Sequence, residues 1–77
     1  MIAVVSIMVT NEHAADAVNA VLHMYRGAVL GRFGLPIKDK GVSVISVVLD
    51  AEPNEVNALT GKLGKIEGVK AKAIYNQ

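Results

Sequence analysis

The stretch that decides the fold is Arg26-Gly-Ala-Val-Leu-Gly-Arg-Phe-Gly-Leu-Pro36, which leads through Ile37-Lys-Asp-Lys-Gly41 into Val42-Ser-Val-Ile-Ser-Val-Val-Leu49. Two β-rich runs flank a short polar turn, so the pattern predicts a long β-hairpin at mid-chain. The first arm carries glycines where strand propensity favours branched residues, which predicts a bent, bulged or closely approached strand. The second arm has no charged residue, which is typical of a strand covered on both faces. We therefore expect the hairpin to need a partner surface.

A strand and a helix are predicted before the hairpin. Residues 2–9 are uncharged and rich in β-branched side chains, which favours a strand in the centre of a sheet. Thr10 or Asn11 can accept hydrogen bonds from the free N–H groups of a first helical turn. Apolar residues then recur at spacings of three and four, which predicts a helix that ends near Tyr25.

A second helix and a final strand are predicted after the hairpin. Pro53 suits the first position of a helix, which we expect to end between residues 64 and 67. Gly61 lies inside this helix, and a close approach of the helix to the sheet would explain it. Residues 69–75 alternate apolar side chains with two lysines, which is typical of an edge strand with one buried face.

The resulting order, β-α-β-β-α-β, predicts one α+β domain over residues 1–77. Short connections and right-handed crossovers favour a ferredoxin-like sandwich, with a four-stranded antiparallel sheet in the order 4-1-3-2 and both helices on one face. In both central strands the odd-numbered and the even-numbered residues are both largely apolar, so the uncovered sheet face is apolar too. We expect the even-numbered set to lie on that uncovered face: Ile2, Val4, Ser6, Met8, Val44, Ser46 and Val48. Because such a surface would aggregate if left exposed, we expect a dimer or tetramer that covers it.

Composition limits the remaining possibilities. The chain has 77 residues, 52% of them hydrophobic, and a net charge of +1. A net charge this small provides no overall electrostatic attraction for nucleic acid. No apolar run is long enough for a membrane span, and the first residues do not resemble a signal peptide, so we expect a cytoplasmic protein that binds neither membrane nor nucleic acid directly. There is no cysteine, hence no disulfide and no thiolate site.

Several activities found on this kind of fold lack the residues that they need. RNA-recognition sheets stack bases on aromatic side chains, which the first and third predicted strands lack. Copper chaperones need a pair of cysteines, and an acylphosphatase needs arginine in the loop after the first strand. Ser43 and Ser46 point to opposite faces, and no histidine is placed to activate either of them. We expect no enzyme activity, and the sequence identifies no cofactor.

Arg32, between Gly31 and Gly34, is the leading candidate for binding chemistry. A guanidinium beside open backbone can bind a carboxylate or phosphate through two hydrogen bonds. The alternative is a salt bridge to an acidic residue of another subunit. The two glycines fit strand packing or a bulge better than a phosphate loop, since no helix follows them.

The histidines are weaker candidates. His13 and His23 are ten residues apart, so on one helix they cannot bind the same metal ion. His23 could be a metal ligand where symmetry brings copies together, with Asp16 or Asn19 one turn away to orient it. The alternative is a polar histidine on a helix surface.

Five segments together resemble a known family. They are Val18-Asn-Ala-Val-Leu-His-Met-Tyr25, Gly31-Arg-Phe-Gly-Leu-Pro36, Lys40-Gly-Val-Ser-Val-Ile-Ser-Val-Val48, and Asn57-Ala-Leu-Thr-Gly-Lys-Leu-Gly64 with Glu67-Gly-Val69. These segments are similar in sequence to the small ACT-like proteins labelled iron-only hydrogenase system regulators. The resemblance implies a βαββαβ domain that oligomerises and senses a small ligand or metal in anaerobic bacterial metabolism. It transfers no catalytic residues to this chain.

The chain departs from amino-acid-binding ACT domains in one loop. Those domains commonly place glycine between the first strand and the first helix, where this chain has Thr10-Asn11-Glu12. The leading hypothesis is a ligand-sensing regulatory oligomer that binds its ligand between subunits, with Arg32, Gly31, Gly34, Asn11 and His23 as the candidate residues. The second is an adaptor whose apolar face docks a metabolic enzyme without any small-molecule site. The third is a metal sensor that uses His23 from several subunits.

Overall fold

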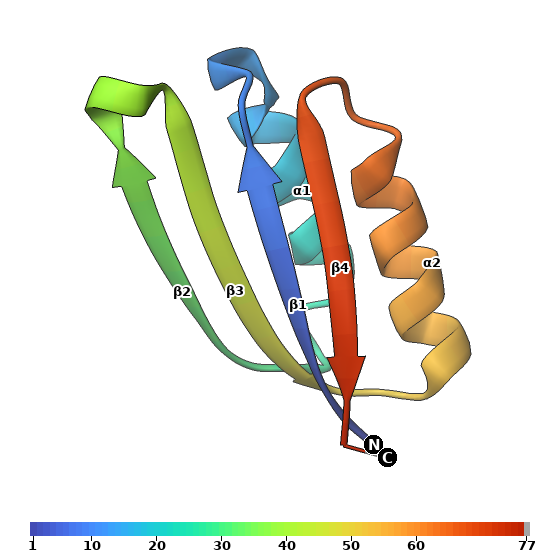
Figure 1. Ribbon diagram of the computed structural model, residues 1–77. Coiled ribbons are helices and arrows are strands. Elements are labelled where there is room, and N and C mark those ends of the chain that lie inside the picture. Colours follow the sequence, from blue (N-terminus) through green and yellow to red (C-terminus); the bar gives the residue numbers. More distant parts are fainter. Residues whose placement is uncertain (77) are drawn as a thin grey trace.

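The computed structural model describes residues 1–76 and contains four strands, two α-helices and two short 3-10 helices (Figure 1). In chain order they are β1 (Ile2–Val9), η1 (Glu12–Ala14), α1 (Ala15–Met24), β2 (Val29–Ile37), η2 (Lys38–Lys40), β3 (Val42–Asp50), α2 (Pro53–Gly64) and β4 (Val69–Tyr75). This order confirms the ferredoxin-like βαββαβ prediction. The second helix and the final strand begin at the expected residues, and the first helix starts as a 3-10 turn.

The sheet is fully antiparallel, and its order, β2-β3-β1-β4, is the predicted one read from the opposite edge. All of β1 pairs with residues 43–50 of β3, with Ser6 opposite Ser46 near the centre. β4 is an edge strand, as its two lysines indicated. Figure 1 shows both helices on the same side of this sheet.

The core lies between the sheet and the two helices. Odd-numbered residues of β1 and β3 supply its sheet half, and Val5, Ile7 and Val47 are almost completely buried. The helices contribute Val18 and Leu22 from α1, together with a stripe from α2. The members of the α2 stripe are Val56, Leu59 and Leu63. Both helices therefore bury one apolar face, as the sequence periodicity predicted.

The expectation for Gly61 is wrong. A Cβ atom built at Gly61 would meet nothing within 4 Å, so α2 does not approach the sheet closely at this residue. The close approach occurs instead at Gly68, where a Cβ atom would lie 2.5 Å from the Cβ of Asn11. The turn into β4 is therefore pressed against the segment that joins β1 to η1.

β2 is exposed along both of its faces. Only its first and last residues are partly buried. Its pairing with β3 shifts between Val29 and Gly31, so the glycine-rich arm is bulged, which was one of the expected irregularities. Gly41 ends η2 in the left-handed region, with φ 67°, and returns the chain into β3. The hairpin thus projects beyond the packed part of the molecule.

The sheet face opposite the helices, hereafter the open face, carries the even-numbered residues of β1 and β3, as predicted. β2 and β4 add to it, because Phe33 pairs with Ser46, and Ile74 pairs with Val4. Four large apolar side chains on this face have exposed fractions between 47% and 70%: Met8, Phe33, Leu35 and Ile74. A large exposed apolar area on a small domain is typical of an interaction surface.

Candidate functional site

Two hollows lie beside α1, because that helix and the exposed β2 strand do not close over one another. The larger hollow, about 710 Å³, lies between the segment that leads into α1 and the end of the β2–β3 hairpin. The smaller hollow, about 380 Å³, lies farther along α1, where the helix ends and β2 begins. Asn19 lines both hollows, so they form neighbouring parts of one groove.

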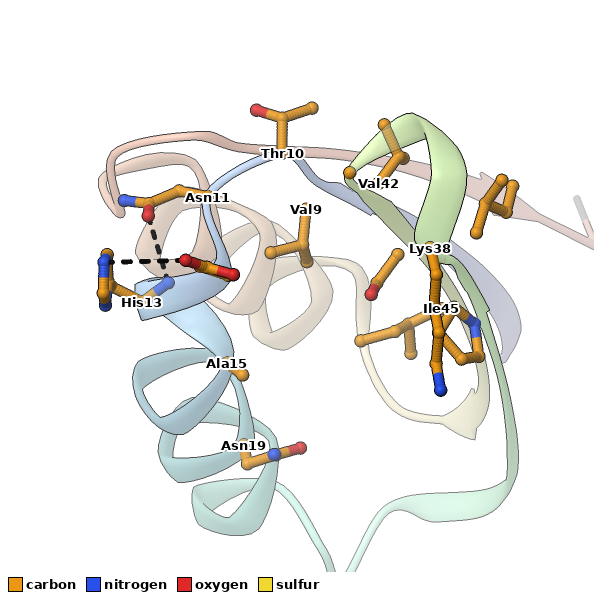
Figure 2. Close-up of a pocket in the computed structure, with 14 residues that line it drawn as sticks. Val9, Thr10, Asn11, His13, Ala15, Asn19, Lys38, Val42 and Ile45 are labelled. Atoms are coloured by element: carbon orange, nitrogen blue, oxygen red, sulfur yellow. Dashed lines mark hydrogen bonds and ion pairs between the residues drawn. The ribbon is translucent and has the colours of Figure 1, made fainter.

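The larger hollow has a mixed lining. Figure 2 shows Val9 and Ile45 deep between its two walls, with Asn19 pointing from α1 towards the hairpin. Lys38 stands on the hairpin side, and His13 on the side of η1. Its volume lies within the range of small-molecule sites, roughly 300–1,000 Å³. A ligand here would meet apolar walls and scattered polar groups of both signs.

Asn11 has a structural role at the rim of the larger hollow. Its side-chain Oδ1 accepts a hydrogen bond of 3.0 Å from the backbone N–H of His13 and so caps η1. Its Nδ2 also donates to the backbone oxygen of Glu67 at 3.5 Å. The neighbouring Thr10 donates from Oγ1 to the backbone oxygen of Gly68. Of the two residues expected to cap this helix start, Asn11 is the one that does.

Replacing Asn11 by alanine is expected to destabilise the fold by about 1 kcal/mol, because the first turn loses its side-chain acceptor. Asn11→Asp is the matched control, since it keeps the acceptor and loses only the long bond to Glu67. Urea unfolding monitored by circular dichroism measures both variants. Equal stability of the alanine and aspartate variants would contradict the capping role.

The smaller hollow contains the two arginines of the groove. Arg32 donates from Nη2 to Oδ1 of Asn19 at 3.0 Å, which ties β2 to α1. Arg26 donates from Nη1 to the backbone oxygen of His23 at 2.9 Å, at the end of the helix. His23 itself lines the same hollow. Val47 forms part of the apolar floor between these polar groups.

The five candidate residues do not lie together in the structure. Arg32 and His23 line the smaller hollow, whereas Asn11 lines the larger one. Gly34 pairs with Ile45 on the helix side of the sheet but lines neither hollow. Gly31 pairs with Val48 and belongs to the open face. One compact site made of all five residues within a single chain is therefore not formed.

Arg26 was not among the candidates, although it stands beside Arg32. The sequence did contain a signal, since Asn19, His23 and Arg26 follow one another at spacings of four and three and share a helix face. What the sequence could not show is that this face lies against β2 and its arginine. Lys38, at the hairpin end, was missed for the same reason.

Neither a metal cluster nor a membrane span is found in the part of the chain that the structure describes. Within residues 1–76, no group of three or more histidine, aspartate or glutamate side chains could hold a metal ion. His13 and His23 line different hollows. No helix of residues 1–76 combines the length and the apolar character needed to cross a membrane.

Comparisons with known proteins identify the family. Residues 1–73 match the family model described as "TM1266-like: Iron-only hydrogenase system regulator, putative". Among solved structures, uncharacterized protein TM1266 from Thermotoga maritima superimposes with a TM-score of 0.93 at 32% sequence identity, over 99% of this chain and 96% of that one. A formyltetrahydrofolate deformylase from Pseudomonas putida KT2440 has a TM-score of 0.69 at 12% identity, over 97% of this chain but 29% of that one, and shares the fold alone. No match is found among curated proteins. The chain belongs to the TM1266-like family.

Proposed function

We propose that this chain is a cytoplasmic regulatory module of the iron-only hydrogenase system, without enzyme activity, that self-associates through its open face and responds to a small ligand bound beside α1. The family description supports the regulatory part of this proposal. TM1266, at 32% identity over nearly the whole chain, has the same fold. The fold supplies an apolar surface for association and, on the opposite side of the sheet, a groove for a ligand.

The observation that carries the proposal is the open face. Phe33 is 60% exposed and Ile74 is 70% exposed in the single chain, and half-buried valines lie between them. Covering such side chains stabilises an assembly by about 25 cal/mol for each Å² of apolar surface removed from water. A domain of this size has a thin core, so association also adds stability that the single chain lacks.

The pattern of charge on the open face fits a second copy of the chain. Lys70 and Lys72 lie along the β4 edge, and Phe33 and Leu35 lie along the β2 edge in the same cross-strand rows. A copy rotated by 180° about an axis parallel to the strands would place β4 of one chain over β2 of the other. Each lysine would then cover apolar or aromatic surface, and lysines of the two copies would not meet. The face is therefore complementary to itself.

Native mass spectrometry of the protein purified anaerobically from its own cells tests the proposal as a whole. We expect a symmetric oligomer that carries an added mass of a small organic ligand. An oligomer without any added mass would contradict ligand sensing and favour an adaptor that docks a metabolic enzyme. An added mass of a metal ion would favour the metal-sensing alternative based on His23. A monomer would contradict association through the open face.

A further inference from the structure

We infer that the smaller hollow beside the end of α1 binds a small organic anion, namely a carboxylate with a short apolar tail. This inference rests on the proposed ligand-sensing function and specifies the chemical class of the ligand and the part of the groove that holds it. Three observations support it: the charges at the rim of the hollow, the apolar floor, and the contrast with the larger hollow.

The charges at the rim are uncompensated. Two guanidinium groups line the hollow, Arg26 from the turn after α1 and Arg32 from β2, and no aspartate or glutamate lines it. Neither arginine forms a salt bridge within residues 1–76. Each donates one hydrogen bond to a neutral oxygen, of His23 or of Asn19. A guanidinium has five N–H donors in a planar fork, so both keep donors for a carboxylate.

These neutral contacts also hold the arginines in place before any ligand arrives. Arg26 is fixed to a backbone oxygen in the last turn of α1, and Arg32 is fixed to a side chain in the middle of the same helix. Side chains that are already oriented lose less conformational entropy on binding. Because the two guanidinium groups come from different elements, an anion between them would link α1 to β2.

The floor of the hollow is apolar. Leu22 and Val47 are buried members of the core, and Val29 is partly buried beside them. A ligand that is only a compact anion, such as phosphate, would leave the remaining exposed surface of Val29 in water. A short aliphatic tail packed over Val29 would remove that surface from water and gain the hydrophobic contribution of each of its own buried methylene groups. The hollow therefore favours a carboxylate with a tail over an inorganic anion.

The larger hollow has no excess of positive charge. It is lined by one lysine, Lys38, and one carboxylate, Glu12, so its formal charges cancel. The two hollows therefore provide a comparison within one molecule, in which a negative ligand should select the smaller one. Lys38 is a suitable control because its loss removes one positive charge outside the smaller hollow.

The position of the site also suggests how a bound ligand would affect the assembly. Arg32 and Phe33 are consecutive residues of β2, and they pair with Val47 of the helix side and Ser46 of the open face. A carboxylate held by Arg32 would therefore act on the same edge strand that carries the exposed phenylalanine. The ligand and a second copy of the chain would contact opposite faces of one strand.

The test is a titration of the ¹⁵N-labelled full chain with 4-methylpentanoate, followed by two-dimensional NMR. We expect a dissociation constant of about 1 mM, as befits so small a ligand, with the largest shifts at the amides of Leu22, His23 and Arg32. The uncharged 4-methylpentanamide is the matched ligand and should bind at least about tenfold more weakly. Equal binding of acid and amide would overturn the role of the arginines, and tighter binding of inorganic phosphate would overturn the role of the apolar floor.

Variants locate the site. Arg26→Gln and Arg32→Gln each remove one positive charge and keep a polar side chain, and each is expected to weaken 4-methylpentanoate binding about tenfold or more. Lys38→Gln should change the affinity less than about twofold. If the largest chemical-shift changes centred on Thr10 and Lys38, the anion would lie in the larger hollow and this assignment would be wrong. A loss of binding in Lys38→Gln alone would lead to the same conclusion. Such a result would leave the sensing function standing, because native mass spectrometry tests that function without reference to the hollow.

Discussion

The Phe33→Glu variant is expected to be a folded monomer. Phe33 is 60% exposed in the single chain, so a glutamate there remains solvated and costs the monomer little. In the proposed assembly the same carboxylate would be buried against an apolar surface without a partner. An uncompensated buried charge costs about 3–5 kcal/mol, which corresponds to a dissociation constant raised roughly a hundredfold to a thousandfold or more.

Sedimentation equilibrium measures the mass of this variant, and circular dichroism verifies its fold. Met24→Glu is the matched control, because Met24 is 62% exposed at the end of α1 and lies outside the sheet. It introduces the same charge on another surface and should keep the oligomer intact. Phe33 is a better position than Val4 or Val44, where a charge would also disturb partly buried packing. If Phe33→Glu keeps the mass of the unmodified oligomer, the open face is not the interface.

The Gly68→Ala variant is expected to lose about 3 kcal/mol of folding free energy or more. Gly68 has φ 81°, in the left-handed region, where a residue with a Cβ atom is strained by about 1–3 kcal/mol. The new Cβ would also lie 2.5 Å from the Cβ and 3.1 Å from the backbone nitrogen of Asn11. Overpacking of this kind adds about 1–3 kcal/mol. The loss is large for a domain whose total stability is about 4–12 kcal/mol.

The clash would also separate two segments that are hydrogen-bonded to each other. The backbone N–H of Thr10 donates to the backbone oxygen of Gly68 at 2.7 Å, and this contact holds the end of β1 beside the turn into β4. Urea unfolding measures the effect, with Gly61→Ala as the control. Gly61 lies in the interior of α2 with open space around it, so alanine there should stabilise the fold by about 1 kcal/mol. Opposite signs for two Gly→Ala changes would confirm this reading, whereas equal stability of Gly68→Ala and the unmodified chain would contradict it.

Much of the fold was predictable because it depends on periodicity and on local chemistry. Successive side chains of a strand point to opposite faces, so Ser6 and Ser46 in the even-numbered set indicated which face of β1 and β3 turns away from the helices. The cap at Asn11 and the helix start at Pro53 follow from backbone groups only one to three residues away. The error at Gly61 arose because the sequence shows that a residue is small but not what lies opposite it.

The candidate site was predictable only in part. Arg32 stood out because it lies between glycines on a strand, and His23 because histidines are few. Their meeting in the smaller hollow, together with Arg26, depends on how α1 lies relative to β2. The angle and distance between two packed elements follow from the whole core, and no short segment contains that information.

The sequence by itself determined the order of elements, the strand order, the apolar open face and the family, because these follow from patterns of residue type along the chain. The tertiary structure alone decided that Asn11 lies at the rim of one hollow, that Gly34 lines neither hollow, and that two arginines share the smaller hollow without an acidic partner among residues 1–76. The physical reason is that a binding site needs side chains from distant segments at one place, and packing of the core against the sheet determines which segments meet.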